Sequence, residues 1–313
     1  MGTLLLARLA ALLALSAAAQ AAPASPEAAA SSFTLSEVKP GVFAAIARPG
    51  DQDSVGNAGF VVGSEAVLVV DAFAGPRAAS ELLDRIRRTT PLPVRWLIDT
   101  HHHGDHCGGN SVFATTGAVI VAQEAARARM RERLAPADLP TLTYRDTLTI
   151  WLGDRRVDVF TKPGHTDGDS LVSVPDADAL FGGDLIQKST VPNLADAKTD
   201  AWIRTLDELA PRFPSATLIP GHGAVARPLD MRALRDYLLT LRTAVARQLA
   251  RGVSGEALRA AIAPALERQF RSWSGAEHIG ETVEQMEREL RGSAKGAAAP
   301  TAVPSPSPRA RGR

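Results

Sequence analysis

Six of the seven histidines in this 313-residue chain fall in three short clusters, and this clustering limits the possible folds more than any other sequence feature. The first cluster, residues 100–106 (THHHGDH), contains four histidines and one aspartate. Residues 163–166 (PGHT) and 220–223 (PGHG) each place one histidine after a glycine, and residues 181–184 (FGGD) lie between them. Neutral imidazole and carboxylate groups are ligands for zinc and its first-row neighbours. The pattern therefore predicts a fold that gathers these segments around bound metal.

The first cluster has a local geometry that can direct several side chains into one pocket. It follows the apolar run VRWLI, which is typical of a buried strand. Alternation in extended backbone places His101 and His103 on the same side. Gly104 then permits a turn, after which Asp105 and His106 can face the same pocket. A polar loop without metal is the alternative, but the glycine-histidine and glycine-aspartate turns downstream argue against it.

The His-x-His-x-Asp-His block resembles the signature of the metallo-β-lactamase superfamily, and the resemblance extends over roughly residues 33 to 250. It implies two metal ions, one held by His101, His103 and His165, the other by Asp105, His106 and His222. It also implies that Asp184 bridges the two ions. His102 falls at a variable position of the signature and is not expected to bind metal. The expected cofactors are two Zn²⁺ ions, with iron or manganese as alternatives.

Strand and helix signals agree with the fold that this resemblance implies, an α/β protein with the αββα four-layer metallo-β-lactamase sandwich. Two β-rich halves, each followed by helices, contain hairpin turns at residues 63–65 and 152–155. We expect a helix over residues 122–133. A later helix should present one apolar face, formed by Leu234, Leu238, Leu241, Val245 and Leu249. One domain is expected over residues 22–290, with C-terminal helices from about residue 229.

The two ends of the chain have compositions that set them apart from this domain. Residues 1–21 are expected to be a secretory signal peptide that ends in the cleavage site Ala-Gln-Ala. Its apolar stretch of eleven residues, Leu9 to Ala19, is too short for a membrane anchor, because a bilayer requires about 20. We therefore expect a periplasmic or secreted protein without a membrane anchor, and N-terminal sequencing of the native protein tests this. Residues 291–313 are expected to be a disordered tail.

The charge balance bears on the possible partners. Without residues 1–21 and 291–313, 35 basic and 34 acidic residues become 29 and 34, a net charge of about −5. A mildly acidic domain is unsuited to binding nucleic acid, because such binding requires a basic surface. The expected partner is a small-molecule carbonyl substrate, and the sequence leaves the oligomeric state open.

The implied ligand set suggests hydrolytic chemistry. Divalent cations lower the pKa of bound water to about 7, which gives a metal-bound hydroxide that can attack a carbonyl. The resemblance gives Asp105 the role of orienting this nucleophile. Asp71, at the end of a predicted strand, is either a partner of a ligand histidine or a turn residue. Cys107 is expected to pack as a small apolar residue beneath the metal loop, with metal binding as the alternative.

The substrate is suggested by a second level of resemblance. Residues 180–186 and 192–197 are similar to segments of exported class B β-lactamases, in which an asparagine like Asn193 helps to hold the substrate carbonyl. The chain departs from that pattern because Asp184 replaces a cysteine ligand and Gln187 stands where a carboxylate-binding lysine is expected, with Lys188 next to it.

These features favour a β-lactam amide as the substrate, and they leave alternatives. An aspartate bridge is typical of lactonases and of glyoxalase II-like thioesterases, so either activity is the first alternative. A mononuclear iron oxygenase similar to persulfide dioxygenases, or a non-catalytic zinc-binding protein, is the second.

Overall fold

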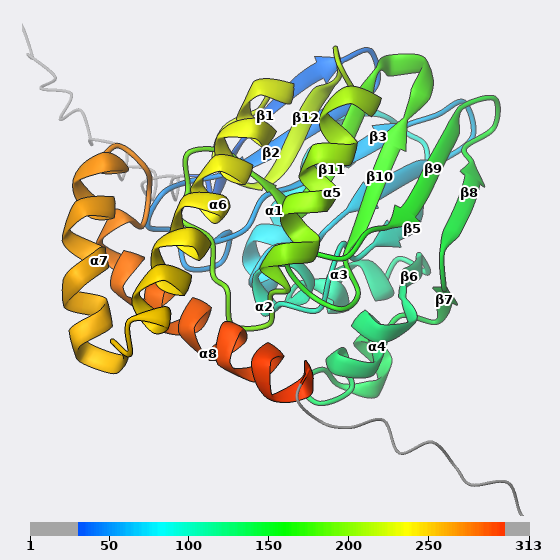
Figure 1. The fold of residues 1–313 in the computed structure, drawn as a ribbon. Helices are drawn as coiled ribbons and strands as arrows, with labels where there is room; N and C mark the ends of the chain where they lie inside the picture. Colours follow the sequence, from blue (N-terminus) through cyan, green and yellow to red (C-terminus); the bar gives the residue numbers. More distant parts are fainter. Residues whose placement is uncertain (1–30, 298–313) are drawn as a thin grey trace, which may run out of the picture. The chain divides into compact units, whose positions relative to one another are not determined.

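The computed structural model describes residues 31–297. The predicted signal peptide, its cleavage site and the chain after residue 297 lie outside these residues. Within them, two β-sheets are packed face to face, and helices cover their outer faces (Figure 1).

The first sheet has seven strands that follow the order of the chain, β1 to β7. Strands β1 to β4 pair in antiparallel fashion, and β4 to β7 pair in parallel. The bounds are β1 Phe33–Lys39, β2 Val42–Ala47, β3 Ala58–Val62, β4 Val67–Val70, β5 Val94–Ile98, β6 Val119–Gln123 and β7 Leu142–Tyr144.

The second sheet has five strands in the order β12-β11-β10-β9-β8. All neighbours are antiparallel except β11 and β12, which run parallel. The bounds are β8 Thr147–Trp151, β9 Arg156–Thr161, β10 Ser170–Val174, β11 Ala179–Gln187 and β12 Thr217–His222.

The helices divide between the two outer faces and the C-terminal end. On the first sheet lie α1 and α3, whereas α5 and α6 cover the second sheet, and α7 and α8 pack beyond α6 (Figure 1). The bounds are α1 Pro76–Thr89, α2 Gly104–Cys107, α3 Asn110–Ala114, α4 Glu124–Met130, α5 Thr199–Arg212, α6 Pro228–Ala250, α7 Gly255–Gln269 and α8 Ile279–Ala297. The predicted αββα arrangement is confirmed.

Strand β4 shows how the sequence creates these layers. Its four residues are all buried, but alternation sends Leu68 and Val70 into the core between the sheets. Val67 and Val69 point the other way, into the core beneath α1. A four-residue apolar run therefore joins two separate hydrophobic layers, as expected for a strand buried on both faces.

Two predicted boundaries differ from the structure. The segment 122–133, predicted as one helix, is split between the end of β6, the short helix α4 and a turn after it, because Ala122 and Gln123 pair with β7. The predicted tail boundary at residue 291 falls inside α8, which continues to Ala297. The helix begins in a segment rich in acidic and apolar residues before Gly292, and it continues for several residues into the Ala-rich and Gly-containing segment that follows.

The strand ends place the candidate ligand segments together. His101–His106 follow β5, Asp184 lies within β11, and His222 is the last residue of β12. His165 lies in the turn between β9 and β10. None of the described helices is long and apolar enough to cross a membrane.

The buried face of α6 generates a stability prediction. Leu234 is fully buried, whereas Leu229 in the same helix is 72% exposed. Leu234→Ala is expected to lower the free energy of unfolding by about 2–5 kcal/mol, because it removes methyl groups and leaves a cavity. Leu229→Ala, the matched control, should change it by less than about 0.5 kcal/mol. Urea denaturation measures both, and equal effects would contradict this packing of α6.

Candidate metal centre

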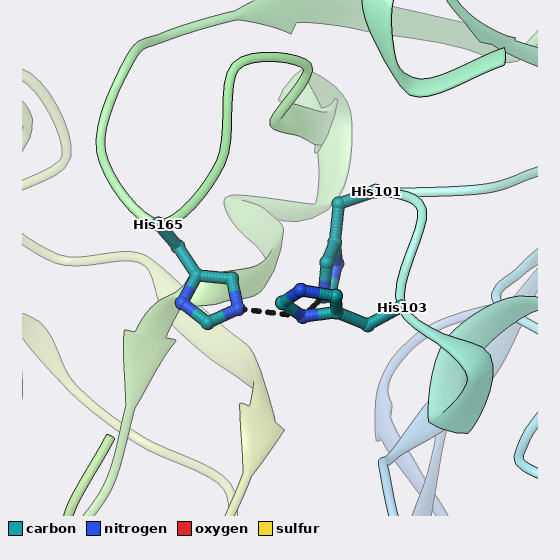
Figure 2. A group of neighbouring side chains, drawn as sticks. All are labelled: His101, His103 and His165. Carbon is teal, nitrogen blue, oxygen red and sulfur yellow. Dashed lines mark hydrogen bonds between the residues drawn. The ribbon is translucent and has the colours of Figure 1, made fainter. Parts of the chain in front are cut away.

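Three histidine rings converge on one point at the end of β5. The Nδ1 atom of His103 lies 3.1 Å from Nε2 of His101 and 3.0 Å from Nε2 of His165 (Figure 2). His101 and His165 are fully buried. Three ring nitrogens at this mutual spacing can act as ligands to one cation.

Contacts on the opposite side of two of these rings fix their orientation. Nδ1 of His101 lies 3.1 Å from Oγ1 of Thr100, and Nε2 of His103 lies 3.0 Å from Oδ2 of Asp196. A carboxylate on one ring nitrogen places the proton there and leaves the other nitrogen free to coordinate. His103 would therefore bind through Nδ1, and His101 through Nε2.

A second group forms beside the first from Asp105, His106 and His222. Oδ2 of Asp105 lies 3.2 Å from Nε2 of His222 and 3.5 Å from Nε2 of His106. The other ring nitrogen of His106, Nδ1, lies 2.9 Å from the buried carboxylate of Asp71. Asp71 also accepts hydrogen bonds from the backbone N–H and the hydroxyl of Thr100, so it is a histidine partner and not a plain turn residue.

Asp184 lies between the two groups. Its Oδ1 is 3.1 Å from Nε2 of His106, and its Oδ2 is 3.4 Å from His165 and 3.3 Å from His222. Gln187 donates to the same Oδ2 at 3.1 Å. One carboxylate thus contacts histidines of both groups, which is the arrangement needed for a bridging ligand.

The buried polar atoms fit a divalent cation. Nε2 of His106 and Oδ1 of Asp184 are both buried, and they lie 3.1 Å apart. Among the described residues, neither atom has a hydrogen-bond partner with acceptable angles. Burial alone would lower the pKa of His106, but Asp105, Asp184 and Asp71 outweigh it and hold that pKa well above its ordinary value. The carboxylates therefore favour a positive charge at this position, either a proton or a metal ion.

The two groups differ in their protonation without metal. Burial lowers the pKa of His101 well below its ordinary value and that of His165 to about 4, so both are neutral at pH 7. In the second group, Asp184 and Asp105 outweigh burial and raise the pKa of His222 to about 9. Burial raises the pKa of Asp105, but His106 and His222 outweigh it and lower that pKa to about 2. Metal binding would thus displace protons mainly from the second group.

A cavity of about 440 Å³ opens over the two groups. Asn193, the residue predicted to hold the substrate carbonyl, is among the lining residues, together with Gln187. Lys188 does not line it, because its Nζ donates to the Val225 carbonyl at 2.9 Å. The full lining is His103, Gly104, Asp105, Arg133, Asp184, Gln187, Thr190, Val191, Asn193, Ala195, Asp196 and His222.

Two cavity residues, Arg133 and Asp196, were not singled out from the sequence. Arg133 follows α4 and is the one Lys or Arg in the lining, and its guanidinium forms no hydrogen bond or ion pair within residues 31–297. Arg133 belongs to none of the motifs found in the sequence, and Asp196 lies in the segment 192–197, where nothing marks it as a partner of His103.

Two further residues, His102 and Cys107, lie next to the candidate ligands in the sequence. His102 turns toward Asp196, with Nε2 3.5 Å from its Oδ2, and its ring centroid is 6.4 Å from that of His101. Together with His103 and Asp196 it forms a further close group of potential ligands. Cys107 is buried, its thiol pKa is raised by burial, and it packs with apolar residues under the loop, as predicted.

Comparisons with known proteins agree on one family. The family model described as the metallo-beta-lactamase superfamily matches residues 51–222. A metallo-beta-lactamase type 2 of Bacteroides fragilis is 27% identical over 53% of this chain and 68% of its own length. A hydroxyacylglutathione hydrolase of Methylococcus capsulatus is 32% identical over 47% of this chain. The match spans about half of that relative, 53% of its length.

Solved structures show the same fold. A metallo-beta-lactamase from Pontibacter korlensis superposes with a TM-score of 0.60 at 23% identity, covering 66% of this chain and 99% of its own.

The ligand geometry predicts different results for two adjacent histidines. His101→Ala should reduce bound zinc by about one equivalent per chain, because it removes one of three converging nitrogens. His102→Ala should leave the zinc content nearly unchanged, because its ring faces Asp196. Elemental analysis of the purified variants measures both, and equal losses would show that the assignment of the ligands is in error.

Proposed function

Because the chain belongs to the metallo-β-lactamase superfamily, we propose that it is a dinuclear zinc hydrolase that cleaves a carbonyl substrate, with a β-lactam amide favoured. The observation that carries this proposal is the contact of Asp184 with histidines of both groups. Zinc held by these residues would lower the pKa of a water to about 7 and polarise a substrate carbonyl.

The residues around the ions have separable roles in this proposal. Asp105 faces the cavity as an ionised carboxylate, so it can accept a hydrogen bond from the attacking water and hold it in position. Asp71 and Asp196 hold the rings of His106 and His103, which keeps the coordinating nitrogens aligned.

Asn193 is the proposed donor to the substrate carbonyl. It lines the cavity, and a fixed amide N–H placed where negative charge develops stabilises the transition state.

Arg133 supports a substrate that carries an anionic group. Gln187 stands where a carboxylate-binding lysine was expected, and the neighbouring Lys188 offers no cation to the cavity because its Nζ donates to the Val225 carbonyl. Arg133, which lines the cavity, supplies the missing positive charge, and a guanidinium binds carboxylate in bidentate fashion. β-Lactams carry such a carboxylate, and export of the chain, which we also propose, would place the enzyme where these compounds are met.

Thioester hydrolysis is the second candidate, and two observations favour it. The bridging position holds Asp184 and not cysteine, and the Methylococcus relative is named a hydroxyacylglutathione hydrolase. An oxygen ligand is harder than a thiolate and is compatible with either substrate class.

A substrate panel distinguishes these candidates. The zinc-loaded protein should hydrolyse nitrocefin and a carbapenem faster than a homoserine lactone or a glutathione thioester. Steady-state kinetics with added zinc gives the four values of kcat/KM. Turnover of the thioester or lactone with inert β-lactams would replace the β-lactamase assignment.

The role of Arg133 predicts a loss confined to substrate binding. Arg133→Ala should raise KM for anionic substrates by about three- to tenfold and leave kcat nearly unchanged, because an exposed charge contact is lost. Arg131→Ala is the matched control, since Arg131 is exposed but does not line the cavity. An unchanged KM in Arg133→Ala would remove this residue from substrate recognition.

A further inference from the structure

Part of the cavity wall is formed by residues 188–198, here called the pocket loop. It joins β11 to α5 and contributes five of the cavity residues. Apart from one isolated bridge, the pocket loop has no regular secondary structure, so other parts of the chain must hold its shape. Three of its attachments come from α8 and from the segment between α7 and α8, which lie beyond the residues that the family model matches.

The first attachment is a backbone bridge near the start of the pocket loop. Ser274 donates its N–H to the carbonyl of Ser189 at 2.8 Å, and its carbonyl accepts from the N–H of Val191 at 2.9 Å. Ser189 has a φ of 49°, in the left-handed region that is costly for a residue with a side chain. The bridge from Ser274 thus holds the pocket loop in a conformation that it would otherwise tend to leave.

The second attachment closes the far end of the pocket loop. Glu289 of α8 accepts from the Thr199 N–H at 2.8 Å and from its hydroxyl at 2.6 Å. Thr199 is the first residue of α5, so the carboxylate satisfies one of the N–H groups that a helix start leaves open. Arg242 of α6 donates to the same hydroxyl at 2.9 Å.

The third attachment reaches the middle of the pocket loop, at Asn193. Gln285 lies four residues before Glu289 and thus on the same face of α8. Its Oε1 accepts from the Leu194 N–H at 2.8 Å, and its Nε2 donates to Oδ1 of Asn193 at 2.9 Å. The Ala195 N–H donates to that same Oδ1 at 2.9 Å.

Two backbone amides determine the orientation of both side-chain amides. The Leu194 N–H can only donate, so the Gln285 atom facing it must be the oxygen, and the Gln285 NH₂ must face Asn193. The Ala195 N–H likewise requires the Asn193 oxygen beside it. The NH₂ of Asn193 is the group left over, and it has no hydrogen-bond partner within the described part of the chain.

We infer that the C-terminal helices position the pocket loop, and that Gln285 is a positioning residue that presents the Asn193 NH₂ to the substrate carbonyl. The catalytic part of this inference rests on the proposed function. A donor already oriented before the substrate arrives needs no reorganisation during the reaction. The C-terminal helices therefore act on the reaction without lining the cavity themselves.

Gln285→Glu tests the amide orientation. The glutamate retains an acceptor for the Leu194 N–H, but it places an oxygen against Oδ1 of Asn193 in place of the NH₂ donor. We expect kcat on the best substrate to fall by about tenfold with KM changed by less than about twofold. Glu281→Gln is the control, because Glu281 lies one turn earlier on α8 and, within residues 31–297, its carboxylate pairs with His278 alone. It should match the unmodified protein.

A double-mutant cycle shows whether Gln285 acts through Asn193. In an Asn193→Ala background, Gln285→Glu should cause no further loss of kcat, because the group that it orients is absent. Independent, multiplying losses would overturn the assignment of Gln285 as the residue that orients Asn193. Zinc content and Tm, measured on each variant, separate this effect from damage to the fold.

Hydrogen exchange tests the positioning without any substrate. In Gln285→Ala, peptides that cover residues 188–198 should take up deuterium faster than in the unmodified protein, while peptides from β5 and β12 remain unchanged. Unchanged uptake in the pocket loop would overturn the inference even if the protein is an active hydrolase. Faster uptake in a protein that hydrolyses none of the four substrates would support the positioning and reject the proposed function.

Discussion

The buried carboxylate of Asp184 is the constraint on which the rest of the site depends. An ionised carboxylate in a closed interior is strongly unfavourable unless positive charge lies next to it. Here His106 and His222 supply that charge without metal, and their pKa values rise even though burial opposes this. The close approach of β12 adds a steric demand, because a Cβ on Gly221 would lie 2.0 Å from Oδ1 of Asp184. Glycine is thus required beside the carboxylate.

The sandwich is what allows so many polar groups to converge. Its two sheets have apolar inner faces, and the parallel strands β4, β5, β11 and β12 end near one another, so their loops meet at one edge. The charged groups lie at this edge and the apolar residues fill the layers. Histidines are held by partners from other strands, such as Asp71 after β4 for His106. The rigidity of the core is in this way transmitted to the ligands.

The sequence predicted the parts of the structure that depend on short-range pattern. Clustered histidines identified the site, and apolar alternation identified most of the strands and the buried face of α6. The predicted turn at Gly104 is present inside the first cluster, although it is the start of the short helix α2 and does not use a left-handed glycine. The partnerships of Asp196 with His103 and of Gln285 with Asn193 span about 90 residues each, and nothing in the local sequence marks them. Such contacts depend on tertiary packing, which a pattern of residue types does not encode.

The central claim is that one carboxylate joins two cation sites in a single cavity. Native mass spectrometry of the metal-free protein during zinc titration tests it most directly. We expect a final state with two zinc ions per chain, with protons released as the sites fill because His106 and His222 must lose theirs. A titration that ends at one zinc ion per chain would show that Asp184 does not join two cation sites.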